Sequence, residues 1–351
     1  KLSGQKPTIL AALGISDEDF DYLIKSEFSK NTSGPNQNSE PLTVANLSYL
    51  YRITLLAKSL NISVRDIVTF RTMSRDADPF AMEWVKNNPA VLFFTANFYT
   101  ANTLTFIERL ETIQSLGFSV AELDYLLRHN YRPSQGIHLE TNTISTALEE
   151  IQEELKKVER IPDIDGDAAA QKAEKDKQFR NAQILAISQR LSNLLNLNNQ
   201  ITYRLLSQWV RSSQDDSKPI ADDFLITEAN PQPEQADEPQ QADDQAPTST
   251  TADPQSIQIE AYTRLHKISL IINKLQVQET LLPWLFEKDR EWLDLNTIPA
   301  DKPDASVPTA TLEKWLHLLT LVQLQDMLPK GAELLDSIFK QEQTDQEFLA
   351  N

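Results

Sequence analysis

The best candidate for a metal site in the sequence is an acidic run with the spacing of a calcium-binding loop. Its carboxylates stand at positions 1, 3, 5 and 12, as in an EF-hand, and belong to Asp163, Asp165, Asp167 and Glu174. The pattern fails at position 6, where the sharp turn requires glycine and this chain has Ala168. The alternative, which the sequence favours, is that these acids precede a helix and stabilise the positive end of its dipole.

Side chains for other chemistry are few and scattered. The histidines are His129, His138, His266 and His317, and none has the spacing of a metal-binding pair. The sequence contains no cysteine, which excludes thiolate zinc sites and cysteine nucleophiles. It also lacks the nucleophile-elbow, phosphate-loop and dinucleotide-binding glycine motifs. We therefore predict a protein that is not an enzyme and uses no cofactor.

The composition narrows the classes of partner. The chain has 33 basic and 51 acidic residues, a formal net charge of −18, and so lacks the basic footprint that nucleic acid or an anionic membrane requires. It contains no run of 18 or more apolar residues, so we predict no membrane span in this segment. Seven glycines in 351 residues disfavour sheet-rich folds and phosphate-cradling loops.

Three short segments share a pattern that ends one helix and starts the next: Leu13–Ser16, Leu60–Ser63 and Leu116–Ser119. Each has Gly or Asn at its second position, where a left-handed residue closes a helix. Each then has a serine followed three residues later by an acid, which predicts a capping box. Two weaker copies lie at Leu195–Asn198 and Leu275–Gln278.

The apolar residues between these corners recur at helical spacing, and no convincing alternating strand pattern is found. A long helix is predicted from about Asp167 to Leu195. The corners are 47 to 80 residues apart, which excludes a uniform solenoid. We therefore predict an all-α fold, an irregular stack of αα-hairpins.

One stretch differs in composition from the rest of the chain. Residues 214–255 contain eleven acids, one base and six prolines, and so account for −10 of the net charge. Such a composition predicts a flexible insertion. The predicted regions are a helical region at 1–210, an acidic Pro-rich insertion at 211–256 and a helical continuation at 257–351. Because the sequence begins at Lys1 without a signal pattern, we expect a fragment of a much longer chain.

The stretch from Leu47 to Phe80 resembles the A component of bacterial insecticidal toxin complexes (Tc toxins). In that family an L-S-x-L-Y-R helix leads into a serine-capped helix, and D-P-F closes the unit. The residues of this chain that match the family pattern include Leu47, Tyr51, Arg52, Ser63, Asp66, Asp78, Pro79 and Phe80. A second stretch, Phe106–His129, is similar to the family's S-G-F-S-x-x-E-L-x-Y-L-L-R-H element, with Leu116 in place of the small first residue. The matching residues include Gly117, Phe118, Ser119, Glu122, Leu123 and Tyr125.

This resemblance implies a role in toxin delivery. The family's A component is a secreted homopentamer whose large helical shell encloses and gates a channel, through which a toxic enzyme from the B–C cocoon enters host cells. The motifs here are similar to shell segments, and the cocoon would bind other parts of the full chain. A host-cell receptor is a further partner that the resemblance implies.

Two other interpretations stay open. The first is a receptor- or partner-binding helical module that uses the acidic insertion, because that segment is long for an ordinary connector. The second is a calcium-regulated protein, which depends on the acidic run at 163–174.

Overall fold

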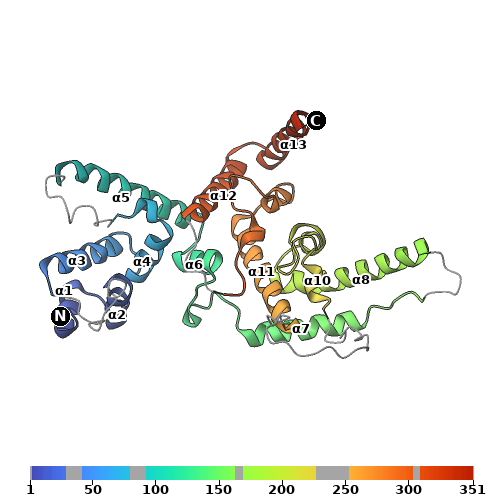
Figure 1. Cartoon of the computed structure of the whole chain (residues 1–351), viewed down its shortest axis with the longest axis horizontal. Coiled ribbons are helices and arrows are strands. Elements are labelled where there is room, and N and C mark those ends of the chain that lie inside the picture. Colours follow the sequence, from blue (N-terminus) through green and yellow to red (C-terminus); the bar gives the residue numbers. More distant parts are fainter. Residues whose placement is uncertain are drawn as a thin grey trace, which may run out of the picture. The chain divides into compact units, whose positions relative to one another are not determined.

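The protein is mostly α-helical, as the sequence predicts (Figure 1). The computed structural model describes residues 2–28, 42–79, 92–162, 169–226, 253–302 and 309–350. Within these ranges the extended pairing consists of one isolated bridge between Arg211 and Pro219, so the prediction of an all-α fold is confirmed.

The chain divides into two compact units. Unit 1 comprises residues 1–131 and 304–319, and unit 2 comprises residues 132–303 and 320–351. This division differs from the predicted regions, because the end of the chain contributes helical residues to both units. The amino-acid composition does not indicate that residues 304–319 belong to the same unit as residues 1–131.

Unit 1 is built from six helices and the first part of a seventh, within the described residues. They are α1 (Lys6–Leu13), α2 (Asp17–Leu23), α3 (Val44–Ser59), α4 (Val64–Met73), α5 (Leu92–Ser115), α6 (Val120–Arg128) and the start of α12 (Thr309–Met327). Its core includes Phe70 and Phe106, whose rings meet edge to face with centroids 4.9 Å apart. The apolar faces predicted from helical spacing therefore pack against one another.

Unit 2 is centred on its most buried helix, α11 (Pro254–Leu275). The other helices of this unit are α7 (Thr141–Lys156), α8 (Ala169–Leu195), α9 (Asn199–Arg204), α10 (Ala221–Phe224), the end of α12 and α13 (Gly331–Ala350). Helix α8 confirms the long helix predicted to end at Leu195. A short 3-10 helix, η9 (Leu282–Phe286), follows α11.

All five predicted helix corners contain a left-handed residue, with φ between 49° and 80°. In each, the next residue donates its N–H to a carbonyl five positions earlier, which is the hydrogen bond of a Schellman motif. These bonds are Ile15 to Leu10 (3.4 Å), Ile62 to Ala57 (3.0 Å), Phe118 to Ile113 (3.2 Å), Leu197 to Ser192 (3.0 Å) and Val277 to Ile272 (3.4 Å). The two weaker copies thus close their helices in the same way as the three strong ones.

The serine caps are confirmed, but the capping box is complete at one corner. Ser16, Ser63 and Ser119 each accept the N–H of the residue three positions on. Glu122 also returns to the Ser119 N–H at 2.8 Å, which completes the box. The prediction of complete boxes at the first two corners is wrong, because the acid there is aspartate, one methylene shorter than glutamate.

The start of the predicted insertion is folded. Residues 211–226 include α10, and the side chains of Ile220 and Phe224 are fully buried. Gln152 of α7 and Gln258 of α11 donate to the Phe224 and Ile226 carbonyls at 3.3 and 3.0 Å. The short apolar run Phe224–Ile226 is the exception within this acidic stretch. Residues 227–252 lie outside the described residues.

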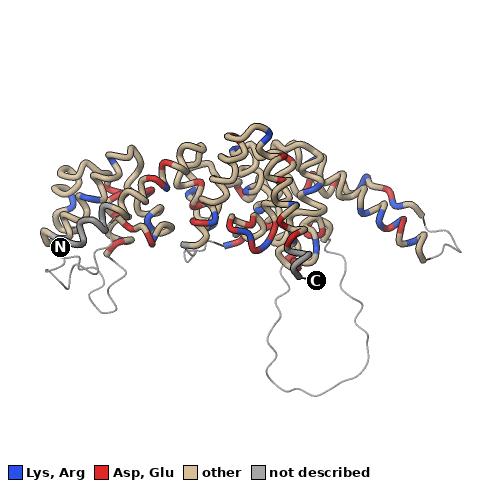
Figure 2. Tube along the Cα trace, turned by 90° about the horizontal axis from the view of Figure 1, so that it is seen from above, with Lys and Arg blue, Asp and Glu red and all other residues tan. Residues whose placement is uncertain are grey.

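Charged residues of both signs are interspersed along the helices (Figure 2). Exposed neighbours of opposite charge recur on helix surfaces, as at Glu153 and Lys156, 2.6 Å apart. Among the helices that the structure describes, none combines the length and the apolar character needed to cross a bilayer.

Candidate functional site

The predicted metal-binding run falls largely outside the described residues. Asp163, Asp165 and Asp167 lie there, and so their arrangement stays a prediction. Glu174 is described, on the exposed surface of α8, where it accepts a hydrogen bond from Gln178 at 3.3 Å. Within the described ranges, no three His, Asp or Glu side chains are grouped so that they could hold a metal ion.

The residues of the first sequence motif, between Leu47 and Phe80, divide between the surface and the interior of unit 1. On α3, Tyr51 and Arg52 are exposed and Leu47 is partly buried. Ser63 caps α4 by accepting the Asp66 N–H at 3.0 Å. At the end of the motif Asp78 is partly buried and Pro79 is buried, and Phe80 lies outside the described residues.

The second sequence motif, within Phe106–His129, includes the corner between α5 and α6. Gly117 adopts φ 80°, which glycine tolerates without strain. Phe118 is buried and meets the Trp315 ring edge to face, with centroids 5.2 Å apart. Ser119 and Glu122 form the capping box described above, and Leu123 and Tyr125 are buried. The matched residues therefore close, cap and pack a helix.

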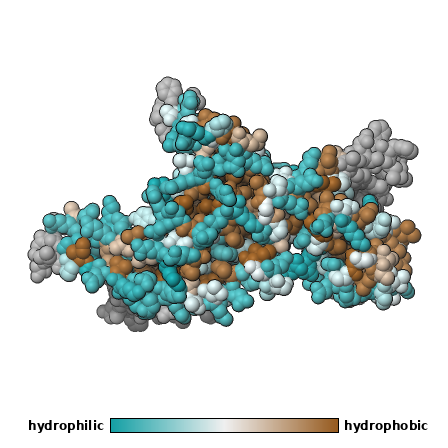
Figure 3. Space-filling model, turned by 180° about the vertical axis from the view of Figure 1, so that it is seen from behind, coloured by the Kyte–Doolittle hydropathy of each residue, from teal (hydrophilic) through white to brown (hydrophobic). Residues whose placement is uncertain are grey.

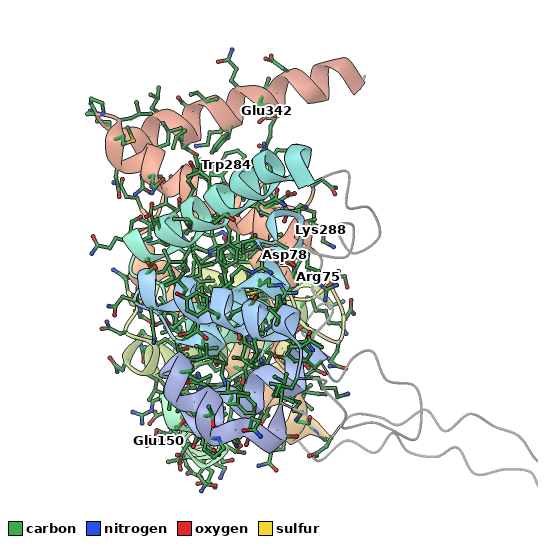
Figure 4. All side chains as sticks on the ribbon, turned by 90° about the vertical axis from the view of Figure 1, so that its left-hand side faces the viewer. Arg75, Asp78, Glu150, Trp284, Lys288 and Glu342 are labelled. Atoms are coloured by element: carbon green, nitrogen blue, oxygen red, sulfur yellow. The ribbon has the colours of Figure 1, made fainter. Side chains whose placement is uncertain are left out.

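Asp78 belongs to a polar cluster that connects several helices of unit 1, and we call it the Arg71 cluster. Its members are Glu27, Tyr49, Arg71 and Asp78. Arg71, on α4, donates through Nε to Asp78 at 2.9 Å and through Nη1 to Glu27 and to the Tyr49 hydroxyl. Figure 4 labels Asp78 in the segment that follows α4.

The Arg71 cluster is shielded from solvent. The side chains of Glu27, Asp78 and Arg71 are 9%, 15% and 22% exposed. Removing one partner from such a pair leaves a desolvated charge, and typically costs about 3–5 kcal/mol. Because Glu27 lies after α2 and Tyr49 lies on α3, the cluster ties these segments to α4.

The chemistry available to the Arg71 cluster is hydrogen bonding between fixed charges. Burial raises the pKa of Tyr49 well above its ordinary value, so its hydroxyl stays protonated and donates to Glu27. A neutral phenol is a poor nucleophile, and both carboxylates are committed to a guanidinium. The geometry therefore suits a structural role, in which the cluster holds neighbouring helices together.

A second polar cluster joins α6 to α4. Asp124 accepts from Arg128 Nε at 2.5 Å and from the Asn130 amide at 2.7 Å. Arg128 also donates to Thr72 Oγ1 on α4 at 2.8 Å. Asp124 and Arg128 are both buried, so this pair too is held away from water.

Sequence reasoning missed the residues that carry both clusters. Glu27 and Arg71 are 44 positions apart, and no local spacing marks them as partners. Asp78 was singled out as a motif residue, but its role as a ligand of Arg71 was not foreseen. The available signal was Arg71 itself, the one charged residue from Ile67 to Met73 in α4, which indicates a cation that needs a partner.

Unit 2 holds buried polar groups of a different kind. Lys267, on α11, is fully buried and donates to the Pro299 carbonyl at 2.6 Å. Asp223, also buried, accepts from Ser212 at 2.6 Å, and burial raises its pKa. Burial lowers the pKa of His266 to about 4, so this imidazole is neutral at pH 7.

No family model, curated protein or solved structure matches this chain. The fold and the two polar clusters of unit 1 define the chain as an all-α protein in which buried polar side chains join helices. The resemblance to Tc toxins stays an expectation from the two sequence motifs.

Proposed function

We propose that this chain is a non-catalytic shell segment of a Tc toxin A component, a subunit that encloses and gates a channel for delivering a toxic enzyme into host cells. The observation that carries the proposal is the pair of sequence motifs within Leu47–Phe80 and Phe106–His129. The proposed architecture is an irregular stack of αα-hairpins forming part of a large helical shell.

The positions of the motif residues support a structural role. Asp78 is held by Arg71, Phe118 packs on Trp315, and Ser119 caps α6. A wall that must keep its shape would use such residues for caps, corners and buried ion pairs.

The proposal includes partners and a place of action. The full subunit would be secreted and would assemble as a homopentamer at the host cell membrane. Its B–C cocoon would bind through other parts of the full chain, and a host receptor would bind on the outer surface. Cysteine is absent from the sequence, which suits a secreted particle with no thiols to oxidise.

The native gene product tests this proposal. We would purify the protein from its producing cells, measure its intact mass and image its particles by electron microscopy. The expected result is a much longer chain in five-fold particles with a central channel. A native product that ends near Asn351 and stays monomeric would overturn the proposal.

A second candidate function is partner or receptor binding through the acidic segment. It is favoured by the anchoring of both ends of residues 227–252 in one place, since Gln258 in the first turns of α11 holds the Ile226 carbonyl at 3.0 Å. Replacing 227–252 by a short Gly-Ser linker tests it. Host-cell attachment should be lost if the segment binds the receptor, and unchanged attachment rejects this candidate.

A further inference from the structure

The Arg290 guanidinium of unit 2 lies among three aromatic rings and between two carboxylates. The guanidinium carbon is 5.2 Å from the Trp284 centroid, 5.5 Å from that of Trp292 and 5.6 Å from that of Phe339. Its nitrogens pair with Glu287 at 2.8 Å and Glu342 at 2.7 Å. A planar, delocalised cation satisfies both kinds of partner at once, through stacking and through its forked N–H groups.

These partners come from two separate segments of the chain. One segment, residues 284–292, contains Trp284, Glu287 and Trp292. Helix α13 contains Phe339 and Glu342. In Figure 4 α13 carries Glu342 above Trp284, and Lys288 lies farther from the helix. Arg290 therefore joins α13 to the segment 284–292.

Two further hydrogen bonds join the same segments. The Trp284 indole N–H donates to Asp336 at 3.0 Å, and the Gln343 amide donates to Glu287 at 2.9 Å. These bonds lie on either side of the Arg290 pairs along α13. The polar contacts described between α13 and segment 284–292 thus all lie around one cation.

Few of the described side chains of α13 are buried. Its buried side chains among those described are Ala332, Leu335 and Phe339, and the described side chains from 340 to 345 are exposed. Leu334 and Ile338 are 45% and 49% exposed, and Figure 3 shows apolar surface beside the grey end of this helix. By contrast, α11 has buried residues along its whole length.

The start of α13 has the geometry of a fixed pivot. Lys330 adopts φ 55°, and Gly331 lies so close to Gln325 that an added Cβ would be 2.1 Å from the Gln325 carbonyl oxygen. A side chain at residue 331 would therefore push α13 away from α12. The helix is anchored at this end and fastened near its middle.

We propose that α13 is a strap that pivots at Lys330–Gly331 and is fastened by Arg290 as a releasable latch. Opening the strap uncovers Trp284, Trp292 and Phe339 while the rest of unit 2 stays folded. The two carboxylates of the latch are 31% and 48% exposed, so added salt weakens their pairing with Arg290. The proposal stands independently of the proposed toxin function.

Hydrogen exchange of the full 351-residue chain, followed by mass spectrometry, tests the latch. In R290A the amides of residues 335–345 should exchange at least about tenfold faster, because opening no longer breaks the latch, while those of α11 keep their rates. R290K should be intermediate, since an ammonium cannot reproduce the planar fork. The matched control is K288A, which removes a nearby cation that pairs with Asp216 away from α13.

Soluble guanidinium offers an independent readout. Millimolar methylguanidinium should slow α13 exchange again in R290A and leave K288A unchanged. Unchanged α13 exchange in R290A overturns the proposal, and so does an equal acceleration in α11, because Arg290 would then stabilise the whole unit. Should R290A fail to fold, E342Q decides the matter: it must accelerate α13 alone, and unchanged exchange there overturns the latch.

Discussion

The two units treat buried charge differently. In unit 1, Arg71 lies between Glu27 and Asp78, and Arg128 pairs with Asp124, so opposite charges meet away from water. In unit 2, buried Lys267 donates to a backbone carbonyl, and the ion pairs of Arg290 lie near the surface. The Arg71 pairs of unit 1 therefore connect α4 to neighbouring segments away from water, whereas the Arg290 pairs of unit 2 involve carboxylates that are more open to solvent.

The difference has an energetic basis. A buried pair that loses one partner exposes the other to the full desolvation penalty. A near-surface pair is screened by salt and is worth less. Unit 1 should accordingly respond to the loss of single charges, and unit 2 to pH and ionic strength.

The largest expected effect tests the buried pairing in unit 1. Arg71→Ala leaves Glu27 and Asp78 without their shared cation, and should lower the free energy of unfolding by about 3–5 kcal/mol. Urea denaturation at pH 7 measures this change. Arg75→Ala is the matched control, because Arg75 is exposed four residues farther on, and should cost less than about 0.5 kcal/mol. Equal costs for the two variants would contradict the comparison.

The next effect tests the pH sensitivity of unit 2. The pKa of His266 is about 4 in the folded protein and about 6.5 in the unfolded chain, so the unfolded state binds more protons between these values. His266 thus contributes stability above pH 6.5 that is lost as the pH falls towards 4. From pH 7 to pH 5 this loss is about 2 kcal/mol.

His266→Gln should remove this part of the pH dependence. Urea midpoints at pH 7 and pH 5 for the wild type and the variant provide the measurement. His317→Gln serves as the control in the same chain. Parallel pH profiles for wild type and His266→Gln would show that the imidazole does not titrate between these values.

A smaller effect is expected from the loss of helix caps, which occur in both units. Ser119→Ala in unit 1 and Asn198→Ala in unit 2 each remove a helix cap and should each cost about 1 kcal/mol. Exposed caps do not depend on buried charge, so thermal unfolding should give similar losses. A loss confined to one unit's variant would mean that caps are also treated differently.

The smallest effect concerns the acidic segment of unit 2. Replacing residues 227–252 with a short Gly-Ser linker should change the unfolding free energy by no more than about 1 kcal/mol, because the anchored ends lie close together. Calorimetry measures the change. Extending the deletion back to Ser212 removes Ile220 and Phe224 from the core, and should destabilise the unit severely.

The local part of the fold could be predicted from the sequence. Gly14, Asn61 and Gly117 marked helix corners because backbone preference and hydrogen bonding act over a few residues. The partners of Arg71 could not be predicted, because they depend on how distant helices pack. The incomplete capping boxes show a similar limit, since one methylene decides whether a side chain reaches back.

The site was less predictable than the fold. The acidic run considered for a metal lies largely outside the described residues, while Trp284, Arg290 and Phe339 drew no attention as a group. Trp284 and Trp292 lie close together in the sequence, whereas Phe339 lies far beyond them. Only the path of α13 brings Phe339 to them, and that path follows from the close approach at Gly331.

The helix corners also bear on how quickly the chain folds. Each joins two helical segments through a few residues, so their ends meet at a small cost in loop-closure entropy. Such neighbours find one another on the order of microseconds, long before contacts between distant segments form. The order of folding should therefore begin at the corners, with the late return of residues 309–319 to unit 1 as the slow step.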